Sequence, residues 1–270
     1  MRDRSSASAT GSVVFVGTGF SLIAQATAEA VREIERADKL LYLVADPAAA
    51  RWLHSLNQTA ESLSNHYAEG KPRSESYLEM TERILSHATA GHRVCVALYG
   101  HPGIGCDPTH MVMARARELG LGARIQPGVS SDACLFADLG IDPMDAGVQA
   151  YEASVFVVRH PRIDTRAALL LWQAGFVGET SIKSSPGADP AGTGILVKTL
   201  ERYYAPEHNV AVYQASWYPI CPPSVEWIPI RSLVGGIKST GCTLYIPPVQ
   251  NREKSGRPRR NRGPSTQAAR

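Results

Sequence analysis

The sequence has the length and composition of a folded protein with a sizeable core. It contains 270 residues, of which 44% are hydrophobic and 20% are charged. Such values are typical of globular domains and differ from those of disordered chains. No apolar run reaches the roughly 18 residues that a membrane-spanning helix requires, so a helical membrane protein is excluded. The length allows one large domain or two of ordinary size.

The formal charge of +3 is unevenly distributed along the chain. Residues 1–10 carry +1, residues 249–270 carry +6 and the body between them carries −4. A negative body is not the electrostatic footprint of a nucleic-acid-binding protein. The basic end could contact RNA or an acidic partner, but such charge runs are more often solvated tails. We therefore expect a disordered leader at 1–10, a disordered basic tail at 249–270 and no nucleic-acid partner.

The cysteines and the N-terminus are typical of a cytoplasmic protein. The five cysteines are widely spaced and include no CxxC pair, which favours reduced thiols over a disulfide framework or a zinc site. Residues 1–10 are rich in Ser and Ala and lack the apolar segment of a secretory signal. We expect neither a bound metal nor an association with membranes.

The first half of the chain alternates between strand and helix patterns. Buried strands are short continuous apolar runs, whereas helices repeat apolar residues at spacings of three and four. In chain order the patterns predict a strand at 12–16, a helix at 22–37, a strand at 39–44, a helix opening at Asp46, a loop at 63–73, a helix at 74–90 capped by Ser74, a strand at 93–98, a helix from Asp107 to Gly120 and a strand at 123–125. This alternation indicates a parallel sheet with helices on both faces.

The second half of the chain has a more mixed pattern. It is predicted to contain strands at 154–158, 168–173, 210–213, 225–229 and 243–246, a Pro/Gly/Ser-rich loop at 184–193 and a helix at 194–204. The change of pattern divides the body into an N-terminal α/β lobe at 11–126 and a C-terminal α/β lobe at 127–248.

Three predicted strands of the first half end in glycine-rich turns, at residues 17–19 (GTG), 99–103 (YGHPG) and 127–131 (PGVSS). In open α/β sheets, ligands bind beyond the carboxyl ends of the strands, where glycine lets the backbone approach them. The turns lack the third glycine of the dinucleotide fingerprint and the lysine of a Walker motif. They therefore favour one organic ligand lying across the sheet edge over a nicotinamide or a nucleoside triphosphate.

The order of these motifs resembles that of the tetrapyrrole methylase superfamily. The blocks that carry the resemblance are residues 14–19 (VFVGTG), 100–103 (GHPG) and 127–130 (PGVS). Within the superfamily the chain looks most like the borosin peptide backbone α-N-methyltransferases. That likeness depends on Tyr67, residues 71–73 (KPR), Tyr77, residues 98–103 (LYGHPG), 136–138 (FAD), 142–143 (DP), 151–153 (YEA), 172–175 (WQAG) and 243–248 (TLYIPP).

The resemblance implies a two-lobed α/β fold that binds S-adenosyl-L-methionine in a cleft between its lobes. The implied cofactor contacts are Tyr99, His101, Ile104, Ser130 and Gln173, and the first glycine turn adds Gly17 and Gly19. The implied catalytic cluster consists of Tyr67, Arg73 and Tyr77.

The chemistry of amide methylation is consistent with these residue types. A backbone amide N–H is very weakly acidic, so its methylation needs a base or stabilisation of the developing oxyanion. We expect Arg73 to favour the phenolate of Tyr67 as the base, while Tyr77 or Arg73 stabilises charge on the amide oxygen. The residues alone favour the two tyrosines as core aromatics, and the resemblance is what favours a catalytic role. Trp172 is most simply a core residue, and the role of His66 is open.

The resemblance also bears on the substrate. Fused borosin enzymes carry an apolar core peptide on a long C-terminal extension, whereas the 22 residues after Pro248 are basic here. We therefore expect a stand-alone homodimeric enzyme that methylates a separate precursor peptide in trans. The alternatives are methylation of a tetrapyrrole or corrin precursor, or of ribosomal RNA, and a catalytically silent peptide-binding module.

Overall fold

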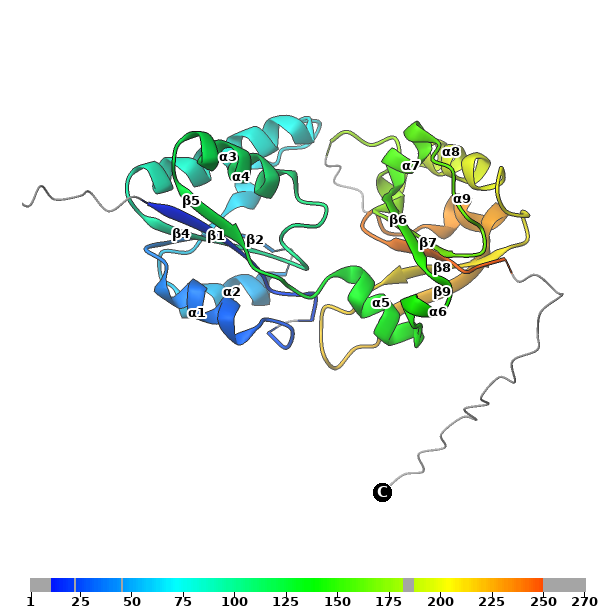
Figure 1. Ribbon diagram of the computed structural model, residues 1–270, viewed down its shortest axis with the longest axis horizontal. Coiled ribbons are helices and arrows are strands. Elements are labelled where there is room, and N and C mark those ends of the chain that lie inside the picture. Colours follow the sequence, from blue (N-terminus) through cyan, green and yellow to red (C-terminus); the bar gives the residue numbers. More distant parts are fainter. Residues whose placement is uncertain (1–10, 22, 45, 182–186, 250–270) are drawn as a thin grey trace, which may run out of the picture.

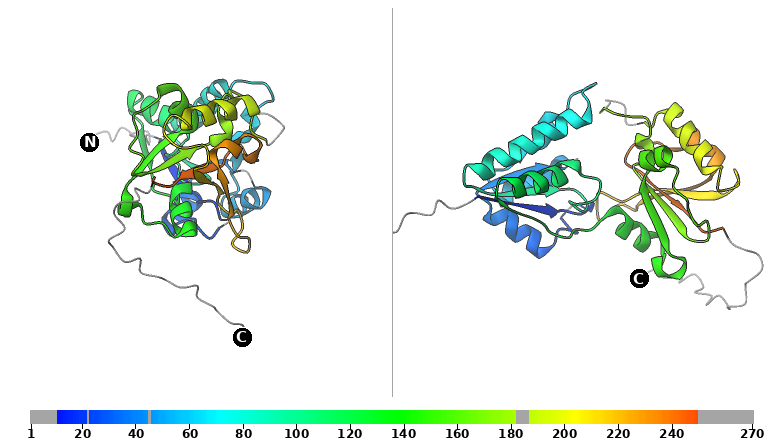
Figure 2. Two further views of the ribbon diagram at one scale, coloured as in Figure 1. Left: turned by 90° about the vertical axis from the view of Figure 1, so that its right-hand side faces the viewer. Right: turned by 45° about the horizontal axis from the view of Figure 1, so that its top comes forward.

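The computed structural model describes residues 11–21, 23–44, 46–181 and 187–249. Two five-stranded sheets, one from each half of the chain, lie side by side with helices packed on them (Figures 1 and 2). This arrangement confirms the predicted α/β class. The expected leader at 1–10 lies outside the described residues, and so does the expected tail at 249–270 apart from Val249, whose amide donates to the carbonyl oxygen of Thr165.

The first sheet is parallel throughout and has the strand order β3-β2-β4-β1-β5. Its central strands are almost fully buried because both of their faces are covered. The five strands are β1 (Ser12–Gly17), β2 (Lys39–Leu43), β3 (Glu61–Ser62), β4 (Arg93–Leu98) and β5 (Gly122–Ile125).

Helices cover both faces of the first sheet, as the alternating pattern predicted. Helices α1 (Ala28–Arg36) and α2 (Pro47–Leu56) pack on one face, and α3 (Arg73–Thr89) and α4 (Asp107–Glu118) pack on the other (Figure 1). A short 3-10 helix, η1 (Leu63–His66), leads toward α3. The apolar cores under the two faces therefore fix the ends of β1, β2 and β4 relative to α3.

The second sheet has the order β6-β7-β10-β8-β9, in which only β6 and β7 run parallel. Helices α7, α8 and α9 bury one face of the sheet, and α5 packs on the other. The elements are α5 (Ser131–Leu139), α6 (Pro143–Ala146), β6 (Val148–Glu152), α7 (Ala153–Arg159), β7 (Ala168–Trp172), η2 (Ala174–Phe176), α8 (Pro190–Leu200), β8 (Asn209–Gln214), β9 (Ser224–Pro229), η3 (Ile230–Ser232), α9 (Leu233–Gly236) and β10 (Thr243–Ile246).

The three glycine turns meet where the two halves of the chain join. A β-carbon added to Gly17 would lie 2.3 Å from the carbonyl oxygen of Gly100 and 3.1 Å from the α-carbon of Gly128. Gly19 and Gly100 also exchange backbone hydrogen bonds. Only glycine allows so close a backbone approach, so the expectation that these turns share one sheet edge is confirmed.

Several predicted elements differ from the structure. Residues 154–158 were expected to form a strand but lie in helix α7, because the Glu152 side chain caps that helix through the amide of Val155. The helix expected at 22–37 begins only at Ala28, where Thr27 provides the cap. Ser74 is not the cap of α3, which begins at Arg73. The helix predicted at 194–204 runs from Pro190 to Leu200.

Candidate functional site

A cavity of about 460 Å³ lies between the two sheets, at the carboxyl ends of β2 and β4. Its volume falls within the range of roughly 300–1,000 Å³ that small-molecule sites occupy. The lining residues come from both halves of the chain: Phe20, Leu43, Val44, Ser64, Tyr67, Arg73, Tyr77, Leu98, Tyr99, His101, Ile104, Gly105, Cys106, Pro108, Ser131, Trp172, Gln173, Phe176, Tyr213, Gln214, Ala215, Trp217, Ser239, Thr240, Gly241 and Thr243.

Most of the site residues predicted from sequence line this one cavity. The lining contains both the predicted catalytic cluster and four of the predicted cofactor contacts, namely Tyr67, Arg73, Tyr77, Tyr99, His101, Ile104 and Gln173. The structure therefore brings together residues separated by more than a hundred positions.

Three predicted cofactor contacts lie beside the cavity and not in its lining. Gly17 is packed in the glycine junction, and Gly19 lines a smaller neighbouring pocket. The Ser130 hydroxyl caps α5 by accepting from the amide of Ala133, and its neighbour Ser131 faces the cavity instead. Roles of Gly17, Gly19 and Ser130 in cofactor binding stay predictions.

Tyr67 and Tyr77 form an edge-to-face pair inside the cavity. Their ring centroids are 6.3 Å apart with the planes inclined at 76°, and both rings pack against the core under α3 and α4. Tyr67 follows η1, whereas Tyr77 lies one turn into α3. Their hydroxyl ends are thus presented from one rigid helix and the segment that precedes it.

Arg73 joins the tyrosine pair from the first residue of α3, but its contacts are to the other half of the chain. Its Nη2 donates to the carbonyl oxygen of Glu179 at 2.8 Å, and its guanidinium carbon lies 4.6 Å from the centroid of the Phe176 ring. Its backbone N–H donates to the carbonyl oxygen of Thr180 at 2.9 Å. This cation–π contact and these hydrogen bonds fix the guanidinium at the cavity wall.

Burial dominates the protonation of both tyrosines. It raises the pKa of Tyr67 well above its ordinary range, and interactions with Tyr77 and Tyr99 raise it further. Burial also raises the pKa of Tyr77, although the Arg73 charge and the Tyr67 hydroxyl offset part of that rise. The choice of Tyr67 as the base stays a prediction.

The opposite wall of the cavity carries polar groups at the end of β7. The indole nitrogen of Trp172 is buried and has no hydrogen-bond partner among the residues that the structure describes. Gln173, the next residue, adopts a left-handed backbone conformation with φ of +56°, which is unfavourable for a residue other than glycine. A buried unpaired donor beside a strained residue is a feature of ligand sites. Trp172 therefore lines the cavity, and a contact between its indole N–H and a ligand is a prediction.

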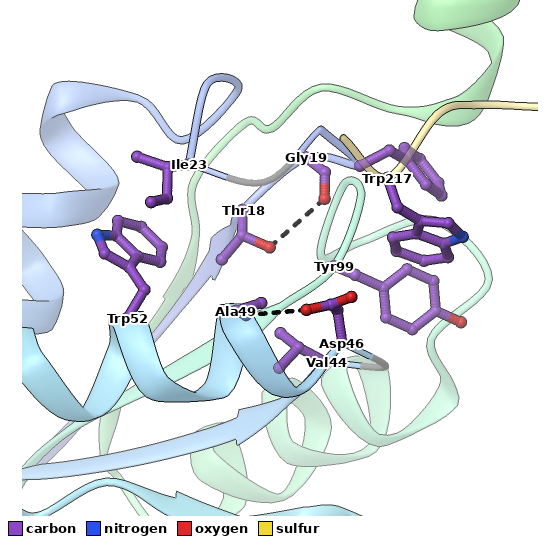
Figure 3. Close-up of a pocket in the computed structure, with 10 residues that line it drawn as sticks. Thr18, Gly19, Ile23, Val44, Asp46, Ala49, Trp52, Tyr99 and Trp217 are labelled. Atoms are coloured by element: carbon purple, nitrogen blue, oxygen red, sulfur yellow. Dashed lines mark hydrogen bonds between the residues drawn. The ribbon is translucent and has the colours of Figure 1, made fainter. Parts of the chain in front are cut away.

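An aromatic group closes the end of the cavity nearest to α2. Trp217, from the loop between β8 and β9, has its ring centroid 5.6 Å from that of Phe20 and 5.9 Å from that of Tyr99. Figure 3 shows Tyr99 and Trp217 side by side at one end of the smaller pocket, with Trp52 and Ile23 at the other. The residue after Trp217 ties the same loop to α2, because the hydroxyl of Tyr218 donates to the carboxylate of Asp46 at the start of that helix.

Sequence reasoning missed several lining residues. Trp172 stands at the end of a predicted strand, a position where ligand contacts concentrate, so its place could have been found. Phe176 and Trp217 lie in irregular segments with no motif of their own, and only the folded structure brings them to the cavity.

The fold and the cavity agree with the family that the sequence matches. A family model described as tetrapyrrole (corrin/porphyrin) methylases matches residues 12–217. The chain therefore belongs to the tetrapyrrole methylase family.

Similar proteins refine this assignment. The methyltransferase/ribosomally synthesized cyclic peptide dendrothelin A precursor of Dendrothele bispora is 38% identical over 251 residues, covering 90% of this chain and 59% of that protein. The corresponding omphalotin A precursor of Omphalotus olearius is 37% identical over 246 residues, covering 88% and 58%. A type III borosin cyclic peptide precursor from Anomoporia bombycina is 34% identical, covering 88% and 28%. The chain spans about three-fifths or less of the length of these relatives.

Solved structures agree with the fold. Uroporphyrin-III-C-methyltransferase from Thermus thermophilus superposes with a TM-score of 0.62 at 20% identity, covering 88% of this chain and 92% of that one. A cobalt precorrin-4 methyltransferase gives a TM-score of 0.59 at 16% identity, covering 87% of this chain and 94% of that one.

Within the described ranges, no His, Cys, Asp and Glu residues group as metal ligands, and no helix is long and apolar enough to cross a membrane.

Proposed function

We propose that this protein transfers methyl groups from S-adenosyl-L-methionine to backbone amide nitrogens of a precursor peptide supplied in trans. The observation that carries the proposal is the Tyr67–Tyr77–Arg73 cluster, which shares one cavity with the polar wall around Trp172 and Gln173. The names of the relatives, each a methyltransferase and a cyclic peptide precursor, support a peptide substrate.

The cavity has the features that a nucleoside-based methyl donor requires. It combines apolar surface at Tyr99 and Ile104, which are 43% and 40% exposed, with the unpaired indole N–H of Trp172. We assign the cofactor to the wall formed by Tyr99, His101, Ile104, Trp172 and Gln173. When bound, S-adenosyl-L-methionine supplies an activated methyl group on a sulfonium leaving group.

The protein's own residues then act on the amide. Arg73 offers a fixed positive charge for the oxyanion that develops on the amide oxygen. Tyr77 accepts the amide proton as its phenolate; burial raises its pKa, and Arg73 and the Tyr67 hydroxyl offset part of that rise. Tyr67, whose pKa is raised, stays protonated and donates a hydrogen bond. The two walls hold the nitrogen and the methyl group in line, which is the main contribution of a site of this kind.

The remaining parts of the proposal concern organisation. The relatives' names join a methyltransferase to a peptide precursor, and we assign the reacting amide to a separate precursor peptide. We divide the body into lobes at 11–126 and 127–248 and place the enzyme in the cytoplasm as a homodimer. The edge strand β9 leaves Val225 and Trp227 36% and 49% exposed, apolar surface of the kind that subunit interfaces bury.

Intact-mass spectrometry tests the function. The enzyme is incubated with S-adenosyl-L-methionine, alone and with a peptide encoded beside its gene or the precursor segment of the omphalotin relative made as a separate peptide. Mass gain of the peptide in steps of one methyl group supports transfer in trans. If the peptide gains no mass with Tyr77→Phe, the transfer depends on the cluster of Tyr67, Tyr77 and Arg73. Gain on the enzyme alone would mean self-modification. Cofactor binding without transfer to any peptide would favour a tetrapyrrole substrate or a silent binding module.

A further inference from the structure

The segment between η1 and α3 carries Tyr67 toward the cavity and ends at Arg73. The residue before Tyr67 is His66, for which the sequence suggested no role. The carbonyl oxygen of His66 belongs to the peptide group that precedes Tyr67, so whatever fixes this carbonyl also fixes the peptide plane to which the α-carbon of Tyr67 is attached.

Two donors meet at that carbonyl. The hydroxyl of Ser76 donates to it at 3.0 Å, and the Nζ of Lys71 donates to it at 3.1 Å. Ser76 is only 1% exposed, so its hydrogen bond is shielded from competition with water and its loss would leave a polar group unpaired. Because Ser76 directly precedes Tyr77 in α3, one short path of atoms connects the backbones of the two tyrosines.

Glu79 completes the arrangement from the next turn of α3. Its Oε1 lies 2.7 Å from the Nζ of Lys71, and its Oε2 lies 3.2 Å from the Nδ1 of His66. Lys71 and His66 lower the pKa of the Glu79 carboxyl, so the carboxylate is ionised at neutral pH. The Glu79 side chain thus contacts residues on both sides of Tyr67, namely His66 and Lys71. An exposed ion pair contributes little to the free energy of unfolding. The contacts of Glu79 are therefore better explained by local positioning of the segment around Tyr67 than by global stability.

We propose that Ser76, Lys71 and Glu79 are positioning residues that hold Tyr67 against Tyr77 by clamping the peptide group between His66 and Tyr67. The proposal rests on the proposed function in assigning work to the tyrosine pair. The clamp ties Tyr67 to the first half of the chain, while Arg73 is tied to the second half through Glu179 and Phe176. The cluster is then preorganised only when both attachments are intact.

Fluorine NMR of the protein labelled with 3-fluorotyrosine tests the clamp without any methyl transfer. The signal of Tyr67 is identified as the one that Tyr67→Phe removes. We expect Lys71→Met and Ser76→Ala to shift or broaden this signal, and Lys71→Arg to restore it. Glu118→Gln is the matched control, because it breaks a comparable surface pair, Arg115 Nη1 to Glu118 Oε2 at 2.8 Å, far along the chain. An unchanged Tyr67 signal in both clamp variants would overturn the proposal.

Kinetics supply the second readout. With the peptide substrate, we expect kcat to fall about tenfold in Lys71→Met and Ser76→Ala while KM and the cofactor Kd stay near their wild-type values, the signature of a misplaced reacting group. A shifted Tyr67 signal with unchanged kcat would contradict a positioning role. If the wild-type enzyme methylates no peptide, the proposed function fails, whereas the NMR result still decides whether the clamp exists. Melting temperatures check that each variant is folded.

Discussion

At the scale of single residues, the cluster is organised by opposing electrostatic effects. Burial disfavours the phenolate of both tyrosines, because a charge loses its hydration inside the protein. Arg73 opposes that effect at Tyr77. In the mechanism that we propose, this difference makes one phenol the proton acceptor and the other a hydrogen-bond donor, as neighbouring titratable groups do in other active sites.

Removing each phenolic hydroxyl should distinguish these roles. We expect Tyr77→Phe to lower kcat by about a hundredfold or more, within the range for loss of a general base. Tyr67→Phe should lower it by about tenfold, the value of one hydrogen bond to a charged group. The pH dependence of kcat separates the two roles further. Because the phenolate of Tyr77 is the active form in the proposed mechanism, the wild-type rate should rise with pH. The residual rate of Tyr77→Phe should not. Tyr67→Phe with full turnover would be inconsistent with its donor role.

The unpaired indole of Trp172 predicts a contact with the bound cofactor. Trp172→Phe keeps the apolar ring but removes the buried N–H donor, so we expect the Kd for S-adenosyl-L-methionine to rise about tenfold. Isothermal titration calorimetry measures this change. Trp52→Phe, which alters the smaller pocket only, is the control. Equal affinities of wild type and Trp172→Phe would remove the indole from the cofactor site.

The site could be predicted from sequence where a residue belongs to a motif at a strand end. Tyr99 and His101 follow β4 directly, so strand prediction and the glycine turn together place them correctly. Phe176 could not be predicted, because its place depends on packing between two distant segments. The pKa ordering of Tyr67 and Tyr77 also required the structure, because burial depends on everything that surrounds the rings.

At the scale of elements, helix α8 shows how closely the second half is packed. A β-carbon on Gly192 would lie 1.8 Å from the carbonyl oxygen of Val177, whereas one on Gly194 would meet nothing within 4 Å. We expect Gly192→Ala to lower the free energy of unfolding by about 3 kcal/mol through overpacking. Gly194→Ala should raise it by about 0.5–1 kcal/mol through helix propensity. Urea unfolding of the two variants measures the difference, and similar values would contradict the packing.

The elements that sequence predicted well are those fixed by strong local patterns. Strand β10 spans the residues expected for it, because a short buried apolar run admits few alternatives. Helix α7 was assigned wrongly because its three valines favour a strand locally, whereas the cap from Glu152 and the burial of Phe156 decide the outcome. Propensity is a weak signal where tertiary packing competes with it.

At the scale of the whole molecule, stability should depend on pH through buried tyrosines. Burial raises the pKa of Tyr204 to about 12 from an ordinary value of 10.0, and its hydroxyl has no hydrogen-bond partner in the described part of the chain. Since the folded state then holds the proton more tightly, the stabilisation is present below pH 10 and is lost as pH rises toward 12. The loss amounts to at most about 3 kcal/mol.

We expect Tyr204→Phe to reduce that alkaline loss and to be neutral or stabilising at pH 7. The neighbouring Tyr203 is the matched control, because its hydroxyl donates to the carbonyl oxygen of Pro161 at 3.0 Å. Tyr203→Phe should lower the free energy of unfolding by about 1 kcal/mol. Chemical denaturation at several pH values measures both variants, and an identical alkaline decline in wild type and Tyr204→Phe would refute the assignment.

The two halves of the molecule meet at the cavity through attachments at both of its ends. Arg73 binds Glu179 and Phe176 at one end, and Trp217 packs on Phe20 and Tyr99 at the other. The residues that we assign to the cofactor and the tyrosine pair thus line one cavity. In the proposed mechanism, an amide nitrogen in this cavity would meet both the methyl donor and the proton acceptor.

The position of the transferred methyl group tests this account most directly. Peptide incubated with the enzyme and S-adenosyl-L-methionine is fragmented by tandem mass spectrometry, and the same peptide with prolines at the reacting positions, which lack an amide N–H, is the control. We predict methyl groups on backbone nitrogens with wild type, and none with the proline peptide or with Tyr77→Phe. Methyl groups on side chains, or undiminished backbone methylation by Tyr77→Phe, would contradict the account.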